Sequence, residues 1–191
     1  MDRNTTGVIA LGGAIVLLIG LIIAVQSGTF GESDSIFGAN EGEDPLLREC
    51  LADHSDLAAH YHPLLTITVN GDQMRIDPNT GIGTSYCPGG NMHLVHVHDS
   101  PEEDGSTKLH VEHDSSVTEP ITLGLFFDIW GVEFSSERIG TFTVDAQHEL
   151  IVRVDGVEVD TYEDTPLEDL GPDENGQEIN QRIEIIYREI A

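Results

Sequence analysis

The chain has 191 residues, with 35 Asp or Glu against 8 Lys or Arg, so its formal net charge at pH 7 is −27. This charge repels nucleic acid phosphates and anionic lipid headgroups, and it excludes both as partners of the protein surface. It attracts cations, although an acidic, lysine-poor surface is also typical of proteins from salty habitats. The length fits one folded domain beside an N-terminal segment.

An apolar run near the N-terminus predicts a membrane anchor. Residues 7–26 contain no charged side chain, and about 20 apolar residues span a bilayer as a helix. A cleaved signal peptide is the alternative, but "AVQSG" at 24–28 is a poor small-x-small cleavage site. We expect a short cytoplasmic end at 1–6, a transmembrane helix at 7–26, and the remainder outside the cytoplasm, at the cell membrane.

The segment after the apolar run is rich in Gly, Ser and acidic residues, which predicts a flexible linker at 27–44. The folded extracytoplasmic domain then covers 45–191. Its first segment, 45–60, has apolar residues at roughly helical spacing and favours a short helix. Alternation predicts a strand at 65–69, and Asn70-Gly71 predicts a tight hairpin that returns through "QMRI".

One solid helix is predicted at 123–130, "LGLFFDIW", with Thr122 as its cap and Gly131 at its end. Strands are predicted beyond it, with an Asp155-Gly156 turn, and an acidic loop precedes the last of them. These predicted segments are "TFTV", "ELIVRV", "VEVD", the loop "EDTPLEDLGPDENGQ", and "RIEIIY". Many strands with one main helix predict an α+β fold on a mainly antiparallel sheet, with a β-grasp-like arrangement as one candidate.

In three pairs of potential metal ligands, the two members of the pair lie two positions apart in the chain. They are His60 and His62, His96 and His98, and His110 and Glu112. In a strand, residues two apart point to the same side. A hairpin centred near Asp104 places 98 opposite 110 and 96 opposite 112, so that four ligands form a square with neighbouring Cβ atoms about 4.5–5.5 Å apart. A solvated or hydrogen-bonded histidine cluster is the alternative.

The ligand types indicate which metal fits such a site. Imidazole with carboxylate suits zinc, Cu(II), Ni(II) or non-haem iron and disfavours Cu(I), so a divalent zinc or copper ion is the expected cofactor. Asp99 follows His98 and is a candidate for orienting a ligand histidine. The histidines without a paired neighbour are interpreted as structural or exposed: His54, His93, His113 and His148.

The two cysteines, Cys50 and Cys87, favour a disulfide outside the cytoplasm, which would contribute about 3–4 kcal/mol in the chain-entropy model. Metal ligation by one or both is the alternative, although neither belongs to a C-x-x-C pair.

Enzymatic motifs are incomplete. Gly90, His96, His98 and Glu102 partly match the first metal motif of cupins, but the following glycine and the second motif are missing. The H-x-D spacing of the non-haem iron facial triad is absent from the histidine-rich segment 93–114 as well. The chain has no H-E-x-x-H, P-loop or G-x-S-x-G motif. Enzyme status therefore stays open.

The string "HYHPLLTITVNG…GIG…C…HVHD…G…LHVE…TLGLFFDIWG" resembles a family of secreted or membrane-anchored archaeal and bacterial domains with H-x-H, H-T-H-D, H-x-E and T-L-G-x-F-F-x-x-W-G motifs. The likeness covers about 50–131 and implies a histidine-centred site outside the cytoplasm, but no reaction. Val97 stands where the family more usually has Thr, and the turn "SPEEDGSTK" is longer than expected.

Together these observations predict a membrane-anchored extracytoplasmic domain that binds a divalent transition metal through strand-borne histidines. A hydrolytic or redox metalloenzyme using the same site is one alternative. A structural or interaction subunit without metal is the other. The sequence does not indicate a protein partner.

Overall fold

The computed structural model describes residues 44–190. The predicted anchor at 7–26 and nearly all of the predicted linker lie outside the described residues. In the part of the chain that is described, no helix is long and apolar enough to cross a membrane.

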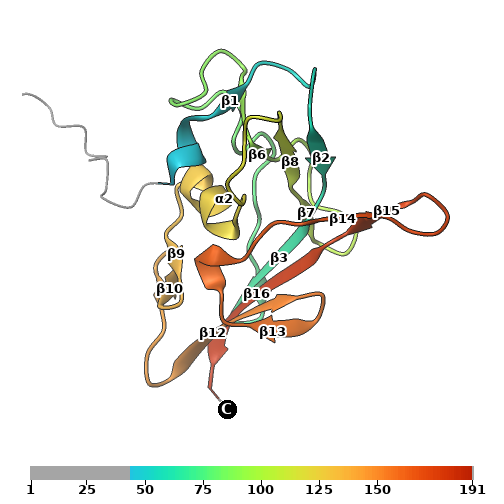
Figure 1. The fold of residues 1–191 in the computed structure, drawn as a ribbon. Coiled ribbons are helices and arrows are strands. Elements are labelled where there is room, and N and C mark those ends of the chain that lie inside the picture. The colour runs from blue at the N-terminus through green and yellow to red at the C-terminus, as the bar shows by residue number, and fades with distance from the viewer. Residues whose placement is uncertain (1–43, 191) are drawn as a thin grey trace, which may run out of the picture. The chain divides into compact units, whose positions relative to one another are not determined.

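The described chain forms short strands, two 3-10 helices and one α-helix (Figure 1). The elements in chain order are η1 (Pro45–Arg48), β1 (Cys50–Leu51), β2 (Ala59–Tyr61), β3 (Leu64–Val69), β4 (Asp72–Gln73), β5 (Met92–His93), β6 (Val95–His96), β7 (Thr107–Lys108), β8 (His110–His113), α2 (Leu123–Trp130), β9 (Phe134–Ser135), β10 (Arg138–Ile139), β11 (Phe142–Thr143), β12 (His148–Val154), β13 (Val157–Val159), η2 (Tyr162–Asp164), β14 (Asp169–Pro172), β15 (Glu178–Asn180) and β16 (Arg182–Glu189).

The largest sheet has the strand order β13-β12-β16-β3-β4, and β7 also pairs with β3. Its pairings are antiparallel except that β16 runs parallel to β3, with Arg182 opposite Leu64 and Tyr187 opposite Val69. The predicted α+β class with a mainly antiparallel sheet and one main helix is confirmed. The β-grasp-like arrangement stays a prediction.

Two predicted turns form tight hairpins. Asn70 and Gly71 have φ of 51° and 88°, and Asp155 and Gly156 have φ of 50° and 81°. Positive φ at both central residues is the type I′ geometry, which suits the twist of the flanking strands. The returning strand β4 is shorter than predicted, since it ends at Gln73.

Two predicted segments are corrected. The helix expected at 45–60 is only the four-residue η1, because the backbone turns extended at Glu49 and enters β1, which pairs with β5. The segment 163–177, expected as an acidic loop, contains η2 and the strand β14, which forms a hairpin with β15.

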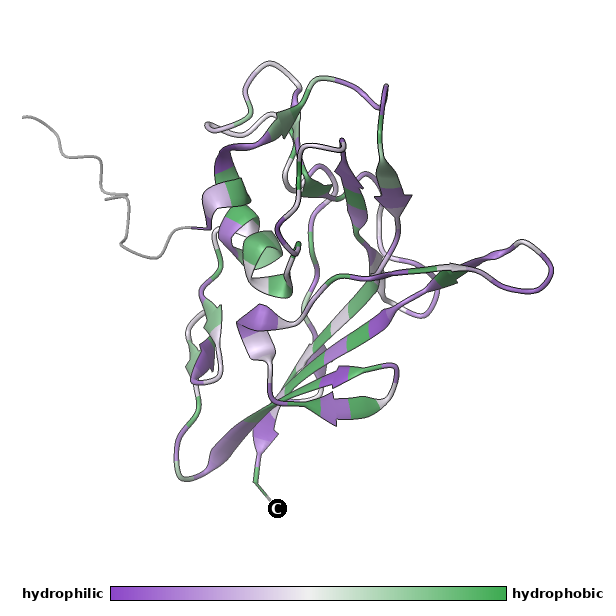
Figure 2. Cartoon of the chain, in the orientation of Figure 1, coloured by the Kyte–Doolittle hydropathy of each residue, from purple (hydrophilic) through white to green (hydrophobic). Residues whose placement is uncertain are grey.

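Helix α2 begins and ends where the sequence predicts. The Thr122 hydroxyl accepts a hydrogen bond from the Leu125 backbone N–H at 3.3 Å, and Gly131 ends the helix with φ of 74°. Phe126 and Phe127 are buried in the main core, to which the large sheet contributes apolar side chains. Figure 2 shows hydrophobic residues on the helix and along the strands of this sheet. This packing places α2 against β6, η1 and η2.

Candidate metal centre

A second, three-stranded sheet with the order β2-β8-β6 carries the paired histidines. Its central strand β8 places Val111 between Tyr61 of β2 and Val95 of β6, and all three side chains belong to the hydrophobic core. Because strand residues alternate between faces, the polar residues on either side of these positions point away from the core. Val97, which lies between His96 and His98, is buried in the same core. The residue between the two ligands of each motif therefore anchors the sheet, and the ligands share its other face.

The predicted register between β6 and β8 is wrong by two residues. The structure pairs His96 with His110, so Glu112 does not lie opposite His96; it pairs with His60 of β2 instead. The long turn after Asp99 leads into β7, which leaves β6 and pairs with β3. A shift by two residues keeps the same face of each strand, and so the ligands still converge.

The loop before β5 supports β6 and the residue that follows it from the side opposite to β8. The Val97 N–H donates to the Thr80 carbonyl at 2.9 Å, and the Asn79 N–H donates to the Val97 carbonyl at 2.8 Å. Gly81 has φ of +82°, and a Cβ there would lie 2.8 Å from the Val95 carbonyl oxygen. Only glycine permits this approach, so Gly81 helps to fix the histidines that β6 presents.

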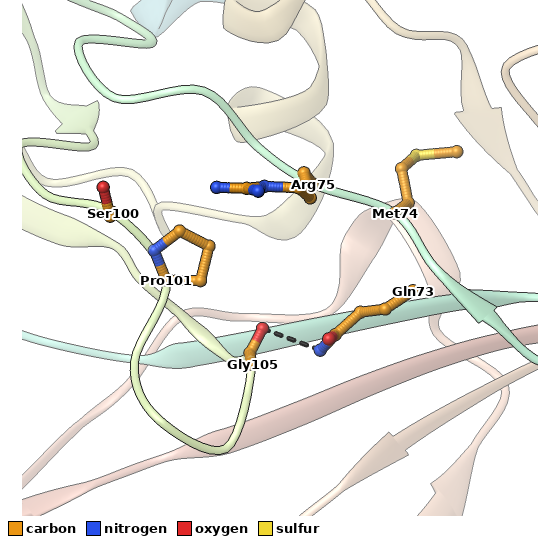
Figure 3. A pocket seen from close by; sticks show the side chains of 6 residues that line it. All are labelled: Gln73, Met74, Arg75, Ser100, Pro101 and Gly105. Atoms are coloured by element: carbon orange, nitrogen blue, oxygen red, sulfur yellow. Dashed lines mark hydrogen bonds between the residues drawn. The ribbon is translucent and has the colours of Figure 1, made fainter.

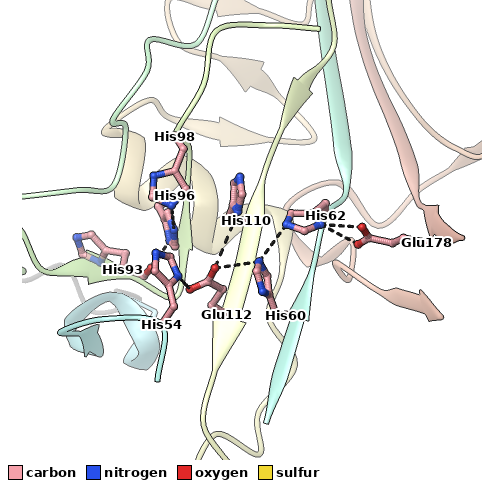
Figure 4. Close-up of polar contacts among 9 residues, drawn as sticks. All are labelled: His54, His60, His62, His93, His96, His98, His110, Glu112 and Glu178. Atoms are coloured by element: carbon pink, nitrogen blue, oxygen red, sulfur yellow. Dashed lines mark hydrogen bonds and ion pairs between the residues drawn. The ribbon is translucent and has the colours of Figure 1, made fainter. Parts of the chain in front are cut away.

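The structure brings five histidines together as two sets of three (Figure 4). One set is His60, His62 and His110, and the other is His96, His98 and His110. Within each set, one ligand nitrogen from every residue lies within 4.8 Å of the others. The Nε2 atoms are 3.0 Å apart in His60–His62 and 3.1 Å apart in His96–His98. Tetrahedral zinc with Zn–N bonds of about 2.0–2.1 Å separates its ligand nitrogens by about 3.3 Å, so the spacing within each of these two pairs is close to that of zinc ligands.

Hydrogen bonds at Nδ1 hold two of these rings with Nε2 available. The His96 Nδ1–H donates to the backbone carbonyl of His93 at 2.9 Å, and the His62 Nδ1–H donates to the Glu178 carboxylate at 2.8 and 2.9 Å. A carbonyl or ionised carboxylate only accepts hydrogen bonds, so the proton of each neutral ring lies on Nδ1. The lone pair of Nε2 is then directed at the neighbouring histidine, as in metal sites whose ligand histidines are oriented by an outer partner.

Glu112 provides a negative charge inside the cluster. Its side chain is 0% exposed. The His54 Nδ1–H donates to Oε2 of Glu112 at 2.7 Å, and Oε1 of Glu112 lies 3.0 Å from Nε2 of His60. A buried carboxylate is costly unless it is paired or coordinates a metal. A cation bound by the histidines would be stabilised by this charge.

Burial keeps two central histidines unprotonated. Desolvation lowers the pKa of His96 to about 4 and that of His110 to about 3; the neighbouring His62 and His98 add to the effect on His110. Because an imidazole must be neutral to coordinate a metal, protons compete poorly with an ion at these positions at pH 7.

Two residues near the cluster were missed by the sequence prediction. His54, interpreted as structural or exposed, is 49% exposed, but its ring lies 5.5 Å from that of His98 and is oriented by Glu112. Glu178 lies 116 positions from His62 in the chain, and nothing in the local sequence links the two. The sequence signal for His54 was its residue type and the carboxylate of Asp56 two positions further on.

The remaining predicted residues lie outside the cluster. Asp99 is exposed and its orienting role stays a prediction. His93 is buried with Nε2 2.7 Å from the Thr84 hydroxyl, while His113 contacts the Asp114 carbonyl and His148 contacts Asp145.

Cys50 and Cys87 form a disulfide, as predicted, so neither thiol is available as a metal ligand. The bridge connects the start of β1 to the loop before β5, and Cys50 lies opposite His93 in that strand pair. It therefore ties down the segment that leads into β6.

No histidine lines the pocket of about 220 Å³ that Figure 3 shows. Its lining consists of Gln73, Met74, Arg75, Ser100, Pro101 and Gly105. This set offers one charged side chain, Arg75, and no His, Cys, Asp or Glu.

No family model, curated protein or solved structure matches this chain. The likeness to a family of membrane-anchored domains therefore stays a prediction, and the geometry of the histidine cluster is the basis for assigning a function.

Proposed function

We propose that this protein binds a divalent transition metal, zinc or copper, through His60, His62, His96, His98 and His110. The observation that supports this best is the convergence of their ring nitrogens in two sets of three on one face of a sheet. The acidic surface and the buried Glu112 favour a cation at this place.

Zinc and Cu(II) suit the donor set better than Cu(I) does. Neutral imidazole is a good ligand for both ions, whereas Cu(I) prefers thiolates and thioethers. The two cysteines are bonded to each other, and so the histidines and Glu112 remain as the donors.

We further propose that the domain works outside the cytoplasm and is held at the membrane by residues 7–26. Their apolar, uncharged sequence supports an anchor, and the Cys50–Cys87 disulfide is consistent with an oxidising compartment. Capture or delivery of metal ions near the cell surface would then be its role.

Elemental analysis tests the proposal. The full-length chain would be purified in detergent without a histidine tag, incubated with zinc or copper, and freed of unbound metal. We expect bound metal in the wild type and none after four replacements by Ala, at His60, His62, His96 and His98. A His113→Ala/His148→Ala double variant is the matched control, because it removes histidines outside the cluster. A wild type that holds no zinc or copper would refute metal binding and favour an interaction subunit.

A metalloenzyme is the second candidate, because each set supplies three histidines. Three protein ligands leave a position of tetrahedral zinc open to water, as in catalytic zinc sites. Hydrolysis of an activated ester by the zinc-loaded protein, lost in the four-histidine variant, would support this function. An inactive zinc-loaded protein would favour simple binding.

A further inference from the structure

His110 occupies the centre of the histidine cluster. It belongs to both sets of three, and Figure 4 shows its ring between the His60–His62 pair and the His96–His98 pair. Either set of three could bind one ion by itself, so a single metal site would not require a histidine that belongs to both sets.

The two pairs are arranged almost alike around this central ring. The ring centroid of His110 lies 4.6 Å from that of His62 and 4.6 Å from that of His98, at 83° in both cases. It lies 5.9 Å from His60 and 5.6 Å from His96. The centroids within each pair are 4.7 Å apart. Each side of His110 therefore presents an equivalent pair of ligands.

The hydrogen bonding of His110 differs from that of the other four. Among the described residues of the cluster, His110 alone has two buried ring nitrogens without a hydrogen-bond partner. Its Nδ1 lies 3.9 Å from the Glu112 carboxylate, beyond hydrogen-bonding distance. One bound ion would satisfy one nitrogen and leave the other N–H buried without an acceptor, which costs free energy. Two ions would satisfy both.

We propose, building on the proposed function, that the cluster holds two divalent ions and that His110 bridges them through its two ring nitrogens. His60 and His62 complete one site, and His96 and His98 complete the other. When the second ion binds, the remaining N–H bond of His110 breaks, a metal–nitrogen bond forms, and the proton passes to solvent. The bridging ring is then an imidazolate, whose negative charge joins that of Glu112 beside the two cations.

Titration of the metal-free, full-length protein with copper(II) sulfate, followed by electron paramagnetic resonance, tests the bridge. We expect two copper ions per chain. The first should give an ordinary Cu(II) signal, and the second should lower the integrated signal below that of the first alone, because an imidazolate couples the two spins. Zinc in place of the second copper should restore the signal.

Variants assign the two sites. His60→Ala/His62→Ala and His96→Ala/His98→Ala should each hold one copper with an uncoupled signal, while the His113→Ala control, on the same strand as His110, should keep the coupled pair. His110→Ala should lose the coupling, and its near-ultraviolet circular dichroism would report whether it is folded.

One copper per chain, or two with simply additive signals, would overturn the bridge while leaving metal binding intact. A wild type that binds no copper or zinc would overturn both proposals. The wild-type spectra decide these outcomes even if His110→Ala does not fold.

Discussion

Replacing Glu112 with Gln should separate metal binding from folding. The substitution keeps the size of a side chain that is fully buried, and it removes the charge next to Nδ1 of His54 and Nε2 of His60. In the metal-free protein, what a buried carboxylate gains from its partners is largely offset by what it loses on leaving water. We therefore expect the free energy of unfolding to change by no more than about 0.5–1.5 kcal/mol, the net contribution of an ordinary hydrogen bond.

Metal affinity should respond much more strongly to the same change. Glu112 lies beside Nε2 of the proposed ligand His60. Loss of an outer partner of a metal site typically weakens binding by about 10–100-fold, or about 1.4–2.8 kcal/mol. Glu112 also balances the charge of the bound cation, which the Gln amide does not. Competition with a chromophoric zinc chelator measures the affinity, and denaturant unfolding of the metal-free protein measures the stability.

Glu178→Gln provides the matched comparison. Glu178 also accepts a hydrogen bond from a cluster histidine, but its side chain is 43% exposed. Water screens such a pair, so the loss should be about 0.2–1 kcal/mol, or less than about fivefold in affinity. Equal affinities for wild type and Glu112→Gln would refute the proposed role of the buried charge. A Glu112→Gln protein that fails to fold without metal would instead assign the carboxylate to the fold.

Three further predictions concern stability. Without metal, the free energy of unfolding should fall as the pH drops from about 6.5 towards 4. The unfolded chain protonates His96 and His110 in this range, whereas burial keeps their pKa values in the folded protein at about 4 and about 3. Denaturant unfolding should show a weaker pH dependence in His96→Ala. Cys50→Ser/Cys87→Ser should lose about 4 kcal/mol for a separation of 37 residues, measured the same way, and an unchanged midpoint would contradict this. Zinc at 100 times its Kd should add about 2.7 kcal/mol for each ion bound in thermal unfolding, and nothing in the four-histidine variant.

The parts of the fold predicted correctly depend on local chemistry. The Thr122 cap, the Gly131 end and the Asn70-Gly71 turn each follow from what one residue type does to the backbone, and the structure contains all three. The helix expected at 45–60 fails because tertiary pairing of β1 with β5 overrides helical spacing in a short segment.

The histidine faces were predictable for a similar reason, but their partners were not. Alternation in a strand places His96 with His98 and His110 with Glu112 whatever the register. Register depends on the turn between the strands, and here the chain leaves the hairpin at β7 to pair with β3. His54 and Glu178 reach the cluster from a loop and a distant hairpin, so only the tertiary structure identifies them.

The central position of β8 explains why His110 contacts both histidine pairs. A side chain on an edge strand has strand neighbours on one side only, whereas one on a central strand has neighbours on both. Because β2 and β6 both pair with β8, an H-x-H motif lies on either side of the same imidazole. The middle residue of each motif packs in the hydrophobic core, on the face of the sheet opposite to the ligands. These residues are Tyr61, Val97 and Val111. Folding of this sheet therefore assembles both sets of ligands together, before any ion binds.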